Sequence, residues 1–283
     1  MLPITKGVLD IIDRALEEDL ASQDTTTACL IAPDQQGQAV LLAKAAGVLA
    51  GVEVACAVFA RVDPSLHTTV LKGDGAPLHP GDHIARVHGA VGGILRAERT
   101  ALNFIQRMSG IATLTSLYVR EVAGLPARIV DTRKTAPGLR YLDKYAVRTG
   151  GGRNHRLNLA DGILVKDNHI AALEARGVSL REAVRRAVEM APHTLKVEVE
   201  VETVAQAQEA LEGGAHILLL DNMNLEAMAD CVALAKGRAL TEASGGITLA
   251  TVRSVAETGV DLISVGALTH SVAAMDISLD FQP

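Results

Sequence analysis

Residues 195–222 read LKVEVEVETVAQAQEALEGGAHILLLDN, and this stretch holds two apolar runs separated by a segment with helical character. Valines alternate with glutamates over 197–201, which is typical of a β-strand, and residues 217–220 form a continuous apolar run. Between them, Thr203 and Gln206 have the spacing of a helix capping box, and two glycines follow where the helix should end. The stretch therefore predicts a strand–helix–strand unit.

The same rhythm recurs through the chain after about residue 110. Apolar runs that end in polar residues are ARIVDTRK, GILVKDNH, LKVEVEV, HILLLDN, LTEASGG and LISVGAL. Helical segments lie between several of them, with capping residues such as Ser179 and Asn224. Strands that alternate with amphipathic helices indicate a parallel sheet covered by helices. A (β/α) barrel, complete or incomplete, fits this pattern. A doubly wound sheet is the alternative, although no glycine-rich dinucleotide fingerprint follows a first strand.

The first part of the chain is organised differently. Apolar residues over 8–20 fall on one face of a helix, and EDLASQDTTT at 18–27 is expected to be a loop. Strand-like pieces with turns follow, and a second helical pattern runs from Leu95 to about Ala123. Residues 1 to about 110 are therefore predicted to form a mixed α+β unit that ends in a long helix.

The composition excludes several classes of function. The chain has 283 residues, of which 48% are hydrophobic and 21% charged, as is typical of soluble globular proteins. A net charge of −6 and an aromatic content of 2% argue against nucleic-acid binding. The most apolar stretch, 39–62, is interrupted by three charged residues, so no membrane span is expected. Three cysteines far apart in sequence indicate free thiols in a cytoplasmic protein rather than a zinc site or disulfides.

Positive charge gathers between residues 131 and 170 of this otherwise acidic chain, where eight Lys or Arg stand against four acids. Barrel active sites lie at the C-terminal ends of the strands, so cations beside these ends should bind a multiply anionic ligand, such as a phosphorylated sugar or a polycarboxylate. This role is assigned to Arg133, Lys134, Arg156 and Lys166. The other cations expected to contribute only a solvated helix face, paired with Asp143, are Arg140, Lys144 and Arg148.

Acids and glycines follow at later strand ends. Glu200 and Asp221 suggest a site for ribose hydroxyls or for Mg²⁺ held between protein and phosphates, although a structural salt bridge to a nearby cation is the alternative. Glu198 shares a strand face with Glu200 and is expected to point into the barrel. Glycines within 244–246 and 265–268 would let backbone N–H groups approach a phosphate.

Other polar residues at the strand ends have less specific interpretations. His155 and His169 are candidate acid–base residues, although a lone histidine is more often a hydrogen-bonding scaffold. Further candidates to which no role is assigned are Asp131, Asp167, Asn168 and Glu242.

Several of these segments resemble a known family. The segment DTRKTAPGLRYLDKYAVRTGGGRNHRLNLADGILVKDNHI closely resembles the signature of the quinolinate phosphoribosyltransferases. GILRAERTALNFIQRMSGIAT, VEVEVET, ILLLDNM, EASGGIT and VGALTHS match the same family in the same order. The resemblance runs from the first helix to the end of the chain, while EDLASQDTTT is a looser match, with Ser22-Gln23 where the family usually has glycine-containing spacing.

The resemblance implies an α/β fold with an N-terminal α/β sandwich domain over 1–110 and an incomplete (β/α) barrel domain over 111–283. The active site would lie at the C-terminal ends of the barrel strands, and the last residues would pack back on the N-terminal domain. The family forms homodimers or assemblies of dimers, in which the N-terminal domain of one subunit closes the barrel of the other. Arg99 would therefore reach the site of the partner subunit.

The resemblance also implies the reaction. Quinolinate and 5-phosphoribosyl-1-pyrophosphate give nicotinate mononucleotide, pyrophosphate and CO₂ in de novo NAD biosynthesis, with Mg²⁺ as cofactor. The residues implied to contact quinolinate or the phosphates are Arg99, Arg133, Lys134, His155, Arg156 and Lys166. Glu200 and Asp221 would hold the ribose and the metal, directly or through substrate or water, and the 5-phosphate would lie against Ser244, Gly245 and Gly266. The catalytic set would be Lys134, Lys166, Glu200 and Asp221.

Three other functions fit part of the pattern. A Schiff-base aldolase would use Lys166, because a lysine at a barrel strand end has the right placement. A relative of the same fold associated with molybdenum transport genes has versions of these motifs that depart further from the quoted strings. A non-catalytic barrel that binds a phosphorylated metabolite would need only the cations.

Overall fold

The computed structural model describes residues 2–282, and their contacts divide the chain into two units. The first unit runs to residue 116 and also contains residues 135–151 and the residues from 268 onward. The second unit consists of residues 117–134 and 152–267. The resemblance implied a boundary near residue 110, with the last residues packing back on the N-terminal domain, whereas the contacts also place residues 135–151 in the first unit.

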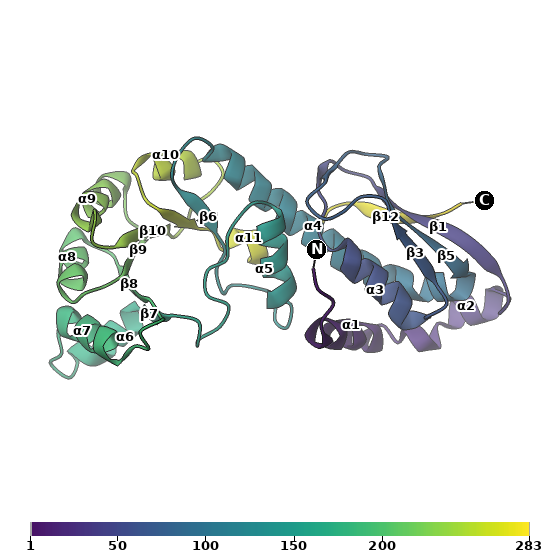
Figure 1. Ribbon diagram of the computed structural model, residues 1–283, viewed down its shortest axis with the longest axis horizontal. Helices are drawn as coiled ribbons and strands as arrows, with labels where there is room; N and C mark the ends of the chain where they lie inside the picture. Colours follow the sequence, from purple (N-terminus) through teal and green to yellow (C-terminus); the bar gives the residue numbers. More distant parts are fainter. Residues whose placement is uncertain (1, 283) are drawn as a thin grey trace. The chain divides into compact units, whose positions relative to one another are not determined.

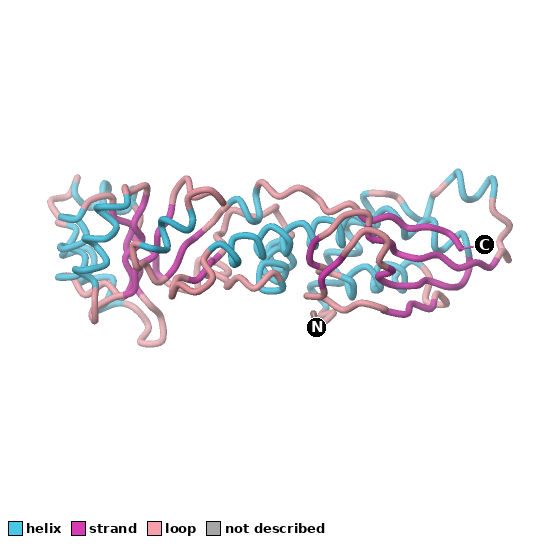
Figure 2. The backbone as a smooth tube through the Cα atoms, turned by 90° about the horizontal axis from the view of Figure 1, so that it is seen from above, coloured by secondary structure: helices cyan, strands magenta, loops and turns pink. Residues whose placement is uncertain are grey.

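The first unit is built on a four-stranded antiparallel sheet. The strands, in their order across the sheet, are β12 (Ile277–Gln282), β1 (Gln36–Ala43), β5 (His83–Ala90) and β3 (His67–Val70). Figure 2 shows the C-terminal strand running beside the others, and the register places Leu279 opposite Leu41. The last residues therefore complete the sheet that the first 90 residues begin. Both leucine side chains of this pair are buried.

The first unit also contains helices. They are α1 (Lys6–Glu18), α3 (Val52–Val62), α4 (Val91–Glu121) and α5 (Arg140–Thr149), with a short ribbon of β2 (Gly47–Val48) and β4 (Pro77–Leu78) beside them. The long helix predicted from Leu95 is α4, which starts four residues earlier. Val8 and Ile12 of α1 are fully buried, as the apolar spacing predicted.

The helix α5 belongs to the first unit, in which an ion pair joins it to α4. Asp143 is fully buried and accepts two hydrogen bonds from the Arg107 guanidinium of α4, at 2.9 and 2.8 Å. Asp143 also accepts the backbone N–H of Ala136 at 3.2 Å. The prediction that Arg140, Lys144 and Arg148 form a solvated face paired with Asp143 is therefore wrong in part, because Asp143 pairs with Arg107 and Lys144 is only 3% exposed. The periodicity of ten residues did not show that α4 supplies the partner.

The segment EDLASQDTTT is not the predicted loop throughout. It contains a 3₁₀ turn, η1 (Ala21–Gln23), and the start of the helix α2 (Thr25–Leu30). Asp24 is the N-cap of this helix, and its carboxylate accepts the Thr27 backbone N–H at 3.0 Å. An aspartate before a polar run is a helix-start signal that the sequence interpretation did not use.

The second unit is a six-stranded parallel sheet. Its order is β6 (Arg128–Val130), β11 (Leu262–Ser264), β10 (Leu240–Ser244), β9 (Ile217–Asp221), β8 (Val197–Val201) and β7 (Ile163–Val165). This order is the one that a barrel gives when it is opened between its first and second strands. All six predicted strands are present, and the incomplete (β/α) barrel is confirmed over the doubly wound alternative, which would require the order to reverse.

The connecting helices follow the caps that the sequence indicated. They are α6 (Asp167–Glu174), α7 (Leu180–Met190), α8 (Val204–Glu212), α9 (Leu225–Ala235) and α10 (Val252–Glu257), with the short α11 (Ala267–His270) after the last barrel strand. Ser179, Thr203 and Asn224 each accept a backbone N–H three residues later. Figure 1 shows α7, α8 and α9 on one side of β8–β10. Within residues 2–282, no helix combines the length and hydropathy needed to cross a bilayer.

Candidate active site

A cavity of about 600 Å³ lies at the C-terminal ends of the strands of the second unit. Strands, strand ends and the segments that follow them supply its walls, as expected for a barrel of this type. The predicted site residues that line it are Arg133, Lys134, His155, Arg156, Lys166, Glu200, Asp221, Ser244 and Gly245. The fold therefore brings together nine positions that span more than one hundred residues of sequence.

Two predicted site residues lie elsewhere. Gly266 is two residues beyond the end of β11, where Ser264 lines the cavity in its place. Arg99 is exposed on α4 and belongs to the first unit. Neither position tests the role that was predicted for the residue.

The cations of the cavity lie close enough to influence one another. Burial, and then the charge of Arg133, lower the pKa of Arg156, while the nearby charge of Glu198 acts in the opposite direction. The Arg156 guanidinium donates to the carbonyl of Gly162 at 3.2 Å. Cations held together in a partly buried cavity repel one another, and a bound anion between them relieves this repulsion. This part of the cavity therefore suits a ligand with several negative charges.

Two acids face the same cavity from neighbouring strands. Glu200 accepts the Lys166 ammonium at 2.8 Å, and Asp221 accepts the side-chain amide of Asn222 at 2.8 Å. These bonds use one oxygen of each carboxylate. Lys166 is also the N-cap of α6, and its backbone N–H donates to Nδ1 of His169 at 2.9 Å.

The glycine after β10 is required by its surroundings. Gly245 has a φ of 94°, and a Cβ added there would overlap the side-chain amide of Asn222. A side chain at this position would therefore be strained and would displace Asn222 from Asp221. Gly245 and Gly246 both line the cavity, and the phosphate loop expected at these glycines stays a prediction.

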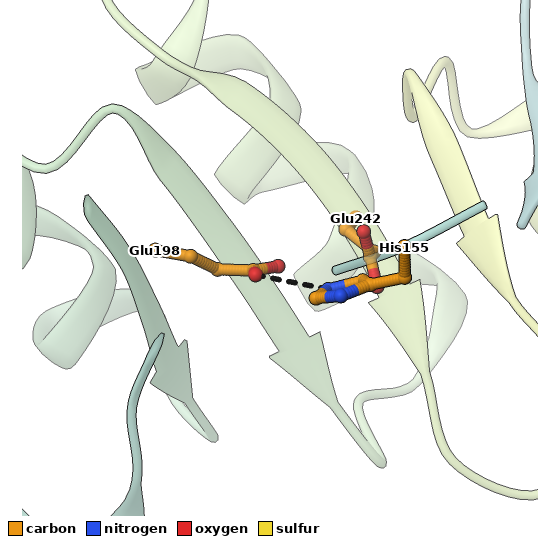
Figure 3. Close-up of side chains that lie close together, drawn as sticks. All are labelled: His155, Glu198 and Glu242. Carbon is orange, nitrogen blue, oxygen red and sulfur yellow. Dashed lines mark ion pairs between the residues drawn. The ribbon is translucent and has the colours of Figure 1, made fainter. Parts of the chain in front are cut away.

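His155, Glu198 and Glu242 form a cluster in which the three side chains point toward one another (Figure 3). The imidazole Nε2 is 3.0 Å from Glu198 Oε2 and 3.6 Å from Glu242 Oε1. The two glutamates are 5% and 2% exposed. Burial, and then the charge of Glu198, raise the pKa of Glu242 to about 8. Sequence reasoning placed both acids at strand ends but did not predict the cluster, although Glu242 shares a strand face with Ser244 of the cavity.

Asp131 organises the segment that carries His155. It is fully buried and accepts the backbone N–H of His155 at 2.8 Å and the side-chain amide of Asn154 at 2.6 Å. The sequence interpretation named Asp131 as a strand-end residue without a role. The contacts make it the residue that holds the 153–156 segment against the end of β6.

The raised pKa of Glu242 predicts how stability depends on pH. Because the carboxyl group binds its proton more tightly in the folded state, folding becomes progressively less favourable as pH rises from about 4.5 to about 8. The groups that set this value are Glu198, Asp131, His155 and Ser264. Glu242→Gln should gain stability relative to the natural protein across this interval, by at most about 1.4 kcal/mol per pH unit. Urea unfolding at pH 5 and pH 8.5 measures the difference, and an identical difference at both values would contradict the prediction.

Comparisons with known proteins agree with the resemblance noted in the sequence. Residues 24–109 match the family model of the quinolinate phosphoribosyl transferase N-terminal domain, and residues 111–280 match that of the C-terminal domain. A probable nicotinate-nucleotide pyrophosphorylase (carboxylating) of Bacillus subtilis is 44% identical over 93% of this chain and 89% of its own. A mitochondrial quinolinate phosphoribosyltransferase (decarboxylating) of Nicotiana tabacum is 44% identical over 97% of this chain and 81% of its own.

Solved structures give the same result. The structure of NadC from Streptococcus pyogenes is 40% identical and superimposes with a TM-score of 0.93, covering 100% of this chain and 99% of that one. The nicotinate-nucleotide pyrophosphorylase of Francisella tularensis is 36% identical with a TM-score of 0.91, covering 100% of this chain and 98% of that one.

Proposed function

The chain belongs to the quinolinate phosphoribosyltransferase family, and on this premise we propose that its barrel cavity binds quinolinate and 5-phosphoribosyl-1-pyrophosphate together. The chain is a decarboxylating pentosyltransferase of NAD biosynthesis. The observation that carries the assignment of the cavity is the convergence of Arg133, Lys134, Arg156 and Lys166 at the C-terminal ends of the barrel strands. Two carboxylates, a 5-phosphate and a pyrophosphate supply the negative charge that such a cavity requires.

The cavity residues perform the reaction mainly by binding and orientation. Pyrophosphate departs from C1 of the ribose with oxocarbenium character, and the fixed cations stabilise the charge that develops on it. The pyridine nitrogen attacks C1 while the carboxylate clamps hold the ring in line. The positive charge of the nitrogen, now quaternary, stabilises the electron pair that stays on C2 when the 2-carboxylate leaves as CO₂, and a proton then binds to C2 in place of the carboxylate. Lys134 and Lys166 are assigned to the charges of the substrates, and His155 and Arg156 to the quinolinate side.

Glu200 and Asp221 are suitable residues for holding Mg²⁺. Hard cations of this kind prefer carboxylate oxygens, and these two carboxylates line one cavity from adjacent strand ends with one oxygen each engaged in the described contacts. When bound together with the substrate phosphates, Mg²⁺ supplies positive charge opposite the leaving pyrophosphate.

Asp221→Ala should separate the two halves of the site. We expect Mg²⁺-dependent binding of 5-phosphoribosyl-1-pyrophosphate to weaken by about tenfold or more, because a charged ligand of the metal and of the ribose is lost. Quinolinate binding should remain within about threefold, since the cations assigned to it are unchanged. Calorimetry with each ligand alone measures both effects, and an equal loss for quinolinate would show that Asp221 is structural.

The salt bridge of Lys166 disfavours the Schiff-base alternative. A lysine that forms an imine needs an unprotonated amine, whereas the Lys166 ammonium is held by Glu200 at 2.8 Å. The assay that tests the proposed function is the release of pyrophosphate and CO₂, each dependent on quinolinate and on 5-phosphoribosyl-1-pyrophosphate. Ligand binding without turnover would instead support the non-catalytic barrel, and borohydride trapping at Lys166 would support the aldolase.

The active unit in this proposal is a homodimer, or an assembly of dimers, with shared sites. All lining residues of the cavity come from the second unit, while Arg99 lies exposed on α4 of the first unit. An exposed arginine on a rigid helix is available to the carboxylates of a site in a second subunit. The proposal also places the protein in the cytoplasm, since Cys29, Cys56 and Cys231 are all free thiols.

A further inference from the structure

A second cavity of about 240 Å³ begins where the first one ends. The two share His155, Arg156 and Glu242 as lining residues. The first residues of strands, such as Ile163 and Ile217, also line the second cavity, together with loop residues such as Asp161 and Gly162. Glu198 lines only the second cavity, so the cluster of His155, Glu198 and Glu242 joins the two cavities.

The hydrogen bonds of His155 fix which ring nitrogen carries the proton. The backbone N–H of Arg156 donates to Nδ1 at 2.7 Å, so Nδ1 must present its lone pair. The proton of the neutral ring then lies on Nε2, which faces Glu198 Oε2 at 3.0 Å. Both ring nitrogens thus have a partner within the protein.

The same hydrogen bonds argue against a metal ion in the cluster. One ligand atom from each of the three residues lies within 4.8 Å of the others, a spacing that a metal would accept. A metal on Nε2 needs the lone pair there, and the other nitrogen then donates its N–H to an acceptor. Here Nδ1 faces a donor instead, so the polarity of the contacts favours a hydrogen bond from Nε2 to Glu198.

We propose that Glu198 is a positioning residue, which holds His155 so that His155 in turn fixes the backbone of Arg156 and directs its guanidinium at the carboxylates of quinolinate. The segment 154–158 has no helix or strand hydrogen bonds of its own. Its two consecutive N–H groups, at His155 and Arg156, are held by the side chains of Asp131 and His155. The backbone position of Arg156 therefore depends on where the imidazole is anchored, while its guanidinium also donates to the carbonyl of Gly162 at 3.2 Å.

The burial of Glu198 supports this role. The carboxylate is 5% exposed, and its Oε1 has no hydrogen-bond partner among residues 2–282. A buried carboxylate with one unsatisfied oxygen costs free energy, so a well-placed imidazole N–H is what stabilises it. The identity of the ligand in this inference rests on the proposed function. The position of the proton on the His155 ring does not.

A comparison of Glu198→Leu with Glu198→Gln tests the anchor. Glutamine keeps a carbonyl oxygen for the Nε2 proton, whereas leucine removes the acceptor at similar volume. We expect Glu198→Leu to weaken binding of phthalate, a dicarboxylate that mimics quinolinate, by about tenfold or more, and Glu198→Gln by less than about threefold. Binding of 5-phosphoribosyl-1-pyrophosphate should change by less than about twofold in both. Equal losses in the two variants, or equal losses for the two ligands, would overturn the proposal.

A double-mutant cycle tests whether Glu198 acts through Arg156. If it does, Arg156→Ala combined with Glu198→Leu should bind phthalate no more weakly than Arg156→Ala alone. Additive losses would overturn the proposal by showing an independent effect of Glu198.

The state of the ring can be measured without any ligand and without a variant at Glu198. Nitrogen-15 NMR of histidine-labelled protein near pH 7, with the signal assigned through His155→Gln, should show the proton on Nε2. A proton on Nδ1 would overturn the proposal even if Glu198→Leu failed to fold. If the natural protein bound neither phthalate nor 5-phosphoribosyl-1-pyrophosphate, the proposed function would fail while the result for the ring still stood.

Discussion

Nicotinate is expected to be used about a hundredfold to a thousandfold less efficiently than quinolinate, or not at all. Quinolinate carries carboxylates at ring positions 2 and 3, while nicotinate carries only the one at position 3. The cavity cations Arg133, Lys134, Arg156 and Lys166 exceed what one carboxylate requires. Lys134 and Lys166 are exposed and Arg133 and Arg156 half-buried without a ligand. With nicotinate bound, a cation that the ring buries without its partner carboxylate costs roughly 3–5 kcal/mol, and each 1.4 kcal/mol is about a factor of ten.

Rates with both pyridines at matched salt, compared as kcat/KM, measure this discrimination. Phthalate is the matched control, because it has both carboxylates but no ring nitrogen to attack the ribose. It should therefore bind and inhibit in competition with quinolinate. Comparable turnover of nicotinate would mean that the cations after β6 do not recognise the second carboxylate.

Arg99→Ala and Lys134→Ala are each expected to be inactive alone but to regain activity when mixed. If Arg99 acts in the site of the partner subunit, a heterodimer of the two variants has one site that carries both substitutions and one that carries neither. Random exchange should place half of the chains in heterodimers, so about a quarter of all sites, and of the natural activity, should return. The large effect follows from the loss of a charge that the buried carboxylates of the substrate require.

Subunit exchange must be verified for this experiment, for example with differently tagged chains recovered together. Arg140→Ala mixed with Lys134→Ala is a useful control, because Arg140 does not line the cavity and is bonded to Thr135 at 3.1 Å. Verified heterodimers of Arg99→Ala and Lys134→Ala that stay inactive would exclude a site shared in this way.

The sequence determined the order and type of most barrel elements. The alternation of valines with glutamates in β8 and the caps at Ser179, Thr203 and Asn224 are local signals, and each was found where it was predicted. The family was also evident from the sequence, because its motifs are long strings of residues rather than single positions. The roles of the individual site residues stay predictions until they are measured.

Two features differ from the sequence-based expectation for different physical reasons. The start of α2 lies in the segment expected to be a loop, although the N-cap at Asp24 is a local helix signal present in the sequence. The partner of Asp143 could not be found in this way, because Arg107 lies 36 residues earlier on another helix.

The tertiary structure alone decided which strand-end residues meet and what they do to one another. Glu198 and Glu242 lie 44 positions apart on strands separated by β9, and only the folded parallel sheet brings both to His155. The direction of the His155 hydrogen bonds and the pKa of Glu242 follow from that meeting. Periodicity reports which face of an element is apolar, because that depends on a few neighbouring residues. Burial, charge and proton positions in the site depend on groups that are close only after the chain has folded.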